Sequence, residues 1–307
     1  MSKRGLAAAV AFIAMAGACL AAQAAGVFIV SRAGVDAYND AKAGFMQMAY
    51  TVQMQGFNPK SVDLDGSAAD DAALNALKGQ SPSVVFAVGA YAARKVRQAM
   101  PDVWIVYAMV YYPEVEGFTA DPKMVGIGSL GSAKDLAGVL KTLGGKTKDM
   151  VVLYDQAIQA SIPSLMDRLN AGGFDALAKP VAGAAGLQSA FDEIKDKARS
   201  VLVLPDPITA NADALRYVIS QCVENRIYPV SLVEGLVSNG VICAAFAPPD
   251  AIGNQAAKVA QQILTQGRAP DDKLVNPDTS ALAVNKRTAE ALKAKLPGNL
   301  RVEVMYE

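Results

Sequence analysis

The stretch "VGIGSLGS", from Val125 to Ser132, decides how the rest of the chain is interpreted. Gly126, Gly128 and Gly131 have the spacing G-x-G-x-x-G of a dinucleotide-binding turn, where glycine lets the backbone approach a pyrophosphate at a helix N-terminus. An extended run precedes these glycines and a helical pattern follows. Glycine's freedom in φ and ψ also suits a connection between two lobes that move. The surrounding sequence has to decide between a cofactor turn and a hinge.

Strand-like and helical segments alternate on both sides of this stretch. "GVFIVS", "SVVFAVG" and "MVVLYD" are continuous apolar runs, typical of parallel strands that are covered on both faces. The first helix is expected over residues 36–55, where Phe45, Met48, Ala49 and Val52 repeat at helical spacing. These patterns predict an α/β protein with parallel sheets, arranged as two similar Rossmann-like lobes.

The lobes are expected to exchange chain segments instead of following one another. Crossings are predicted at the glycine-rich stretch, at "AAFAPPD" and at "NPDTSALAV", which would give a three-segment hinge. The predicted division is a signal peptide at 1–24, one lobe from 25–128 plus 248–277, and a second from 129–247 plus 278–307. Ligands bind at the carboxyl ends of strands in open α/β sheets, so facing lobes would share a cleft.

Composition excludes several classes of function. The 307 residues carry a formal net charge of +0 and no basic tract, so binding to nucleic acid has no electrostatic support. Histidine is absent, which removes the commonest general base and the commonest metal ligand. The acidic stretch "DLDGSAADD" is interpreted as a loop and helix start, because Leu74 would occupy the twelfth position of a calcium loop. We expect no catalytic residue, metal site or cofactor.

The N-terminus has the pattern of an export signal. Lys3 and Arg4 precede an apolar stretch that ends in the cleavage motif Ala-Gln-Ala at 22–24, which predicts a periplasmic protein. Cys19 could instead accept a lipid. The two cysteines of the mature chain, Cys222 and Cys243, could pair in an oxidising compartment or could be small buried apolar residues, and the sequence leaves both possibilities open.

Polar and aromatic residues gather where the expected strands end. Gly89, Ala90 and Tyr91 begin a helix whose free N–H groups suit an anionic group. Acids at other strand ends could bind an ammonium group. The remaining candidates of this kind are Tyr38, Tyr111, Tyr112, Asp155 and Asp206.

The chain resembles the ABC-transporter substrate-binding family that includes tryptophan- and tyrosine-binding lipoproteins. The matching segments cover nearly all of the mature chain, and include "YNDAKAGF", "VVFAVGAYAAR", "VYAMVYYP", "MVGIGSLGS", "VLVLPDP", "YPVSLVEGLVSNGVICAAFAPPDAIG" and "LAVNKRTAEALKAKLP". The resemblance implies a type 1 periplasmic-binding-protein fold with the ligand between the lobes.

The resemblance also implies a set of ligand contacts. They are Ser31, Tyr38, Gly89, Ala90, Tyr91, Met109, Tyr111, Tyr112, Asp155, Asp206 and Glu234, with Gly126 and Gly128 at the hinge. Two departures from the family pattern make the cleft less polar: Ala90 stands where a threonine is common, and Tyr112 stands where an aspartate is common. These departures therefore favour an aromatic or apolar ligand over an amino acid.

Together these features predict a monomeric solute-binding protein that closes on a small organic ligand and delivers it to an ABC permease. Two alternatives stay open at this stage. The same fold could report ligand occupancy to a membrane receptor, or the glycine motif could belong to an exported NAD-dependent enzyme.

Overall fold

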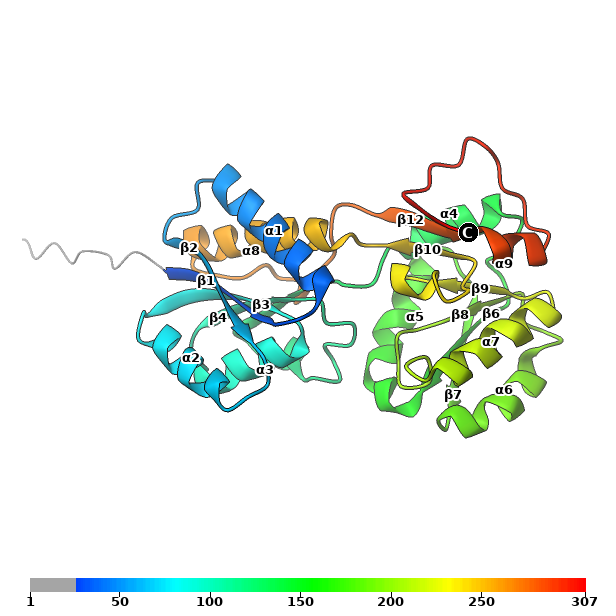
Figure 1. The fold of residues 1–307 in the computed structure, drawn as a ribbon, viewed down its shortest axis with the longest axis horizontal. Coiled ribbons are helices and arrows are strands. Elements are labelled where there is room, and N and C mark those ends of the chain that lie inside the picture. The colour runs from blue at the N-terminus through cyan, green and yellow to red at the C-terminus, as the bar shows by residue number, and fades with distance from the viewer. Residues whose placement is uncertain (1–25) are drawn as a thin grey trace, which may run out of the picture.

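The structure, a computed structural model, describes residues 26–307. The predicted signal peptide and Cys19 lie outside the described residues. The chain forms two separate sheets, each with its own helices, which lie side by side along the long axis of the molecule (Figure 1). We call the sheet that contains β1, with its helices, lobe 1, and the other sheet with its helices lobe 2.

Lobe 1 has a six-stranded sheet in the order β11-β5-β4-β3-β1-β2, and every neighbouring pair is parallel. Its strands are β1 (Gly26–Arg32), β2 (Phe57–Leu64), β3 (Pro82–Val88), β4 (Trp104–Ala108), β5 (Met124–Ile127) and β11 (Leu274–Val275). Its helices are α1 (Asp36–Thr51), α2 (Ala69–Lys78), α3 (Ala90–Ala99), the short η1 (Phe118–Ala120) and α8 (Pro249–Gln266).

Lobe 2 has a seven-stranded sheet in the order β13-β12-β10-β9-β8-β6-β7. Its strands are β6 (Met150–Asp155), β7 (Ala176–Val181), β8 (Ser200–Leu202), β9 (Tyr228–Ser231), β10 (Cys243–Phe246), β12 (Ala281–Asn285) and β13 (Val304–Tyr306). Its helices are α4 (Ala133–Thr142), α5 (Ile162–Ala171), α6 (Leu187–Ile194), α7 (Ala212–Glu224) and α9 (Lys286–Ala291), with the short helices η2 (Gln156–Ser161), η3 (Ala184–Gly186) and η4 (Glu234–Leu236). The sequence predicts parallel sheets, but this sheet has one antiparallel pair. The chain returns from lobe 1 into β12, which runs antiparallel to β10.

The continuous apolar runs are strands buried on both faces, as predicted. In β1, Val27 and Ile29 pack towards α1 and α8, whereas Phe28 and Val30 belong to the cluster on the α2 and α3 face. All four side chains are buried. Covering both faces removes the alternation of polar residues that a one-sided sheet would show.

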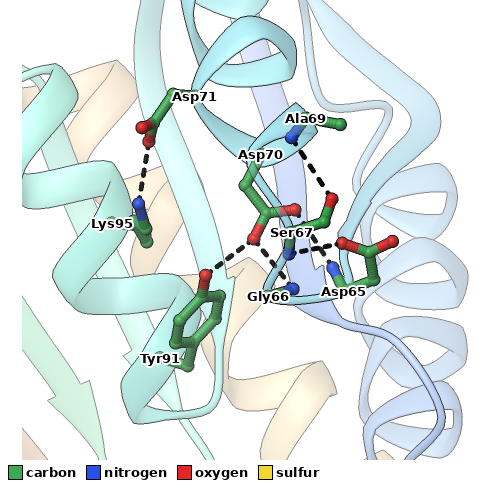
Figure 2. A network of polar contacts seen from close by, with 8 residues as sticks. All are labelled: Asp65, Gly66, Ser67, Ala69, Asp70, Asp71, Tyr91 and Lys95. Atoms are coloured by element: carbon green, nitrogen blue, oxygen red, sulfur yellow. Dashed lines mark hydrogen bonds and ion pairs between the residues drawn. The ribbon is translucent and has the colours of Figure 1, made fainter.

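The first helix is shorter than expected, with Phe45 and Ala49 buried on its inner face. It ends at Thr51, Val52 is its C-cap, and Gln53 has a positive φ of 49°, which turns the chain out of the helix. The acidic stretch after β2 is a loop and helix start, as interpreted. The carboxylate of Asp70 accepts hydrogen bonds from the backbone N–H groups of Asp65 and Gly66, at 3.1 and 3.0 Å (Figure 2).

The chain passes between the two sheets three times, after β5, after β10 and after β11. Figure 1 shows these three segments running between the lobes. The predicted residue boundaries of the lobes stay a prediction.

Candidate functional site

The loop after β4 extends from lobe 1 to lobe 2. Met109 has a left-handed backbone, with a φ of 58°, and packs against the core of lobe 1. Tyr111 and Tyr112 follow, and both pack against the core of lobe 2. Their rings are 6.4 Å apart and tilted by 56°. A strained residue at the end of a strand thus places two aromatic side chains across the space between the sheets.

A cavity of about 210 Å³ opens beside this loop and is lined from both lobes. Most of its lining is apolar. The lining residues lie at strand ends, helix starts and chain crossings. The lining residues are Ala37, Met109, Tyr111, Ser129, Leu232, Val233, Glu234, Gly235, Phe246, Ala247, Pro249 and Ile252. We call this space the interlobe cavity. Three sequence-predicted residues, Met109, Tyr111 and Glu234, meet in it.

Tyr38 and Gly89 lie against each other in lobe 1. Gly89 has a φ of 90°, and a Cβ atom placed on it would lie 2.6–2.8 Å from two ring carbons and the hydroxyl oxygen of Tyr38. Glycine is required here both by the backbone conformation and by the ring above it. Tyr38 therefore covers the N-terminus of α3, where the sequence predicts an anion site. Burial raises the pKa of Tyr38, and the charge of Arg32 partly opposes this.

Ala90 and Tyr91 are directed into lobe 1. Ala90 packs against the core cluster on the α2 and α3 face. The hydroxyl of Tyr91 donates to Asp70 Oδ2 at 2.7 Å (Figure 2). The guanidinium of Arg32 lies 4.8 Å from the centre of the Tyr91 ring, a cation–π contact. These contacts hold α3 to α2, and they leave the predicted roles of Ala90 and Tyr91 in ligand binding untested.

Ser31, the residue before the last of β1, belongs to a partly buried polar network. Its hydroxyl donates to Asp63 Oδ1 at 2.5 Å, and Lys42 Nζ donates to the same oxygen at 2.9 Å. Ser31 is fully buried and Lys42 nearly so. Its hydroxyl is therefore used within lobe 1, and its contact with a ligand stays a prediction.

Asp155 and Asp206 come together in lobe 2. Asp206 Oδ2 accepts the backbone N–H of Asp155 at 2.8 Å, and Oδ1 accepts that of Thr209 at 3.0 Å. The carboxylate of Asp155 accepts the N–H of Ala157 and so begins η2. Burial raises the pKa of Asp206, which is 6% exposed. Both acids organise strand ends, and Asp206 has a partner on each oxygen.

Tyr112 lies near these acids. Burial, followed by the negative charge of Asp206, raises the pKa of Tyr112. Its hydroxyl is buried and has no hydrogen-bond partner within residues 26–307. A buried donor without a partner costs free energy. Tyr112 does not line the interlobe cavity, so its contact with a ligand stays a prediction.

Glu234 begins η4, and its Oε1 accepts a hydrogen bond from the hydroxyl of Tyr306 in β13. Burial raises the pKa of the Glu234 carboxyl. The negative charge of Glu234 also contributes to the raised pKa of Tyr111, after burial and Tyr38. Tyr38 of lobe 1 and Glu234 of lobe 2 therefore both act on Tyr111.

The sequence reasoning missed Ser129, Phe246 and Tyr306. The hydroxyl of Ser129 accepts the backbone N–H of Val110 at 3.0 Å, which fastens the aromatic loop to the first crossing. Phe246 ends β10 at the second crossing, where the sequence signal was "AAFAPPD". Tyr306 carries no local signal, because its partner Glu234 is 72 residues away.

The glycines of "VGIGSLGS" are used for close approach, and none has a positive φ. Gly126 lies inside β5, where a Cβ would meet the Tyr107 ring at 2.4 Å. Gly128 donates its N–H to Val275 at the third crossing, 2.8 Å away. A Cβ on Gly131 would lie 1.8 Å from the carbonyl oxygen of Ala245. Neighbouring chain segments fill the space that a pyrophosphate would need.

A larger cavity, of about 410 Å³, lies between the start of α4, the end of α5 and residues 276–280. It contains none of the sequence-predicted ligand contacts. Arg168 lines it and donates to the carbonyl oxygens of Leu130 and Gly131, both at 3.1 Å. We assign the candidate site to the interlobe cavity, because that space joins the aromatic loop to Glu234.

Three further features bear on function. Cys222 and Cys243 are both buried and free, and burial raises the pKa of the Cys243 thiol to about 12. Within the described part of the chain, no group of three or more acidic or cysteine side chains could hold a metal ion. None of the helices found over residues 26–307 is both long enough and apolar enough to span a bilayer.

Comparison with known proteins identifies the family. The family model described as ABC transporter substrate binding protein matches residues 58–305. A tyrosine-binding protein of Clostridioides difficile is 20% identical over 218 residues. That alignment covers 68% of this chain and 62% of the relative, so the chain matches less than two thirds of the relative's length.

Solved structures establish the fold. The ligand-free, open structure of a substrate-binding protein with adhesive properties from Clostridium difficile has a TM-score of 0.70 at 16% identity, covering 92% of this chain and 99% of that one. A protein from Streptococcus pneumonia in complex with L-Trp has a TM-score of 0.59 at 15% identity, with the same coverage. The fold is the predicted two-lobed α/β fold of type 1 periplasmic binding proteins. Since the family model spans most of the chain, the protein belongs to the ABC transporter substrate-binding family, whose members bind and do not catalyse.

Proposed function

We propose that this protein captures a small aromatic or apolar molecule, such as an aromatic amino acid, in the interlobe cavity and delivers it to an ABC permease. The observation that carries the proposal is that cavity, in which an apolar lining from both lobes surrounds Tyr111 and Glu234. Moving the lobes together would enclose a ligand on all sides. The tyrosine- and tryptophan-binding relatives support an aromatic ligand.

The proposal includes a location and a division of the chain. Export by the N-terminal signal would place the protein in the periplasm, where it would work as a monomer. The lobes would be 25–128 plus 248–277 and 129–247 plus 278–307. The proposed ligand contacts are first Met109, Tyr111, Tyr112 and Glu234, with Tyr38 and Gly89 beside them.

Isothermal titration calorimetry with L-tyrosine and L-tryptophan tests the proposal. Tyr111→Ala should weaken binding by about 10-fold, because the aromatic contact and its buried area are lost. Tyr50→Ala is the matched control: Tyr50 is 62% exposed in lobe 1 and does not line the cavity, so this variant should bind like the wild type. Equal loss of affinity in both variants, or none in either, would count against the interlobe cavity.

Co-purification offers an independent readout. The protein should be isolated from the periplasm without a denaturing step, and small molecules released by heat should be identified by mass spectrometry. An aromatic compound that is absent from the Tyr111→Ala preparation would support the proposal. A sugar or an inorganic anion in its place would contradict it.

A further inference from the structure

The interlobe cavity has a strongly one-sided distribution of charge. Glu234 is the one charged residue among those that line it in the described part of the chain. Its Oε1 is bound by the Tyr306 hydroxyl, whereas no described residue hydrogen bonds to its Oε2. A carboxylate that keeps a free oxygen beside an apolar cavity attracts a cation with hydrogen-bond donors.

The two other acids predicted at strand ends, Asp155 and Asp206, do not line the interlobe cavity. Each oxygen of Asp206 accepts a backbone N–H group, and Asp155 caps η2. The sequence predicted that Asp206 would hold the cationic end of a ligand. Asp206 already has a partner on each oxygen and does not line the cavity, so we assign that role to Glu234.

Of the basic side chains near the cleft, Arg168 and Lys42 already have partners, and Arg32 lies outside the lining of the cavity. Arg168 donates to the carbonyl oxygens of the first crossing. Arg32 is exposed and stacks on the Tyr91 ring, and Lys42 pairs with Asp63 at 2.9 Å. None of these three lines the cavity. A carboxylate of the ligand would therefore be buried next to Glu234 without a counter-ion, which is unfavourable.

The following inference rests on the proposed function. We propose that the ligand is an aromatic amine whose ammonium group pairs with Glu234, and that binding does not require a carboxylate on the ligand. Tyr306 is a positioning residue. By donating to Oε1, it holds the carboxylate of Glu234 in place and leaves Oε2 without a partner among the described residues. Tyr111 and Phe246 of the lining provide the aromatic surroundings. This refines the class of substrate from amino acids to amines that carry an aromatic ring.

Four probes that share an indole ring test this proposal by calorimetry: tryptamine, L-tryptophan, indole-3-propionate and indole. Tryptamine should bind at least as tightly as L-tryptophan, and indole-3-propionate should bind about 10- to 100-fold more weakly than tryptamine, the difference expected for a charge-assisted hydrogen bond. Indole-3-propionate binding as tightly as tryptamine would overturn the amine assignment and leave the aromatic site intact. If none of the four binds, the proposed function and this inference both fail.

Two variants assign the roles of individual residues. Glu234→Gln should lower tryptamine affinity about 10- to 100-fold and leave indole affinity unchanged, since indole carries no charge. Glu290→Gln, on the exposed face of α9, is the matched control and should leave both unchanged. Unchanged tryptamine affinity in Glu234→Gln would overturn the assignment, and retained indole binding excludes misfolding as the cause of a loss.

Tyr306→Phe separates positioning from packing. Removing the hydroxyl withdraws a hydrogen bond from the ionised carboxylate, so tryptamine binding should be lost at a higher pH than in the wild type. Indole affinity should not change, because the ring of residue 306 is kept. A pH profile identical to that of the wild type would show that Tyr306 does not act through Glu234.

Discussion

At the scale of single residues, the acids of the cleft have different tasks that their residue type does not reveal. Asp206 and Glu234 are both partly or wholly buried, and burial raises the pKa of both. Asp206 accepts backbone N–H groups from Asp155 and Thr209, which fixes the turn after β8. Glu234 has one side-chain partner and faces the cavity. We therefore expect a structural phenotype for one acid and a binding phenotype for the other.

Asp206→Ala should lower the free energy of unfolding by about 1–3 kcal/mol, because buried N–H groups lose their acceptors. Urea denaturation measures this change. Asp271→Ala is the control: Asp271 is exposed and pairs only with Arg268 on the surface, so its loss should change stability by less than about 0.5 kcal/mol. A stable Asp206→Ala protein with no ligand affinity would instead make Asp206 a ligand contact.

The pH dependence of amine binding follows from Glu234. Since burial raises its pKa, the carboxyl takes up a proton at a higher pH than an exposed glutamate does. Protonation removes the charge that attracts the ammonium group, so tryptamine affinity should fall as the pH drops through this raised pKa. An alkyl ammonium stays protonated throughout, as lysine does. Calorimetry between about pH 4 and pH 8 follows this loss.

The groups around Glu234 make this profile interpretable. In the described structure, Tyr306 of β13 donates a hydrogen bond to Glu234, and the charge of Glu234 acts on Tyr111 of the loop after β4. The pKa of Tyr111 is raised by burial, so Tyr111 stays neutral over the same range. Indole affinity should remain flat with pH. A parallel fall for indole would point to a change in the whole cleft.

At the scale of elements, α1 and α8 pack closely because glycines remove side chains from their contact. A Cβ on Gly44 would lie 2.0 Å from the carbonyl oxygen of Asp250, and one on Gly253 would lie 1.9 Å from that of Ala41. The two helices belong to the same lobe although some 200 residues separate them in the chain. Their N-terminal ends supply Ala37 and Ile252 to the interlobe cavity. The close packing of this helix pair therefore shapes one wall of the site.

Gly253→Ala should separate α1 from α8, lower the free energy of unfolding by about 1–3 kcal/mol and weaken ligand binding, since the methyl group has no space. Gly138→Ala is a control that should change the free energy of unfolding in the opposite direction. Gly138 is exposed in α4 and nothing lies near the added atom, so alanine should stabilise the protein by about 0.5–1 kcal/mol. Thermal and urea denaturation of both variants measure the two changes. Equal effects of the two substitutions would contradict the packing argument.

At the scale of the whole molecule, the sequence predicts the fold better than the site. Apolar runs such as "GVFIVS" identify strands because burial on both faces excludes polar residues from them. The three crossings follow from glycine, proline and polar stretches between such runs. Tyr91 and Asp206 show the limit of this reasoning. Each is polar or aromatic at a strand end, yet Asp70 and Thr209 in the same lobe take up their hydrogen bonds.

Residues of the cavity that come from distant segments could not be paired from the sequence. Tyr306 meets Glu234 because β13 joins the edge of a sheet that the chain has left and re-entered. No spacing of residues in the sequence predicts that contact. The glycine motif has a similar lesson: its three positions resemble a cofactor turn, and their close neighbours come from β4, from β10 and from the third crossing.

The last prediction concerns movement of the lobes about their crossings. The three glycines of the motif differ in how well they tolerate a substitution that would test it. Gly126 and Gly131 are packed against the Tyr107 ring and the Ala245 carbonyl, so alanine at either position should destabilise the protein directly. Gly128 is the suitable probe, because its added Cβ would lie 3.0 Å from the side-chain oxygen of Asn276, which can move aside. Gly128→Ala should keep wild-type stability and stiffen the first crossing. Small-angle X-ray scattering, with and without saturating tryptamine, should then show a smaller ligand-induced decrease in the radius of gyration than the wild type shows. An unchanged decrease would place the closing motion in the second and third crossings instead.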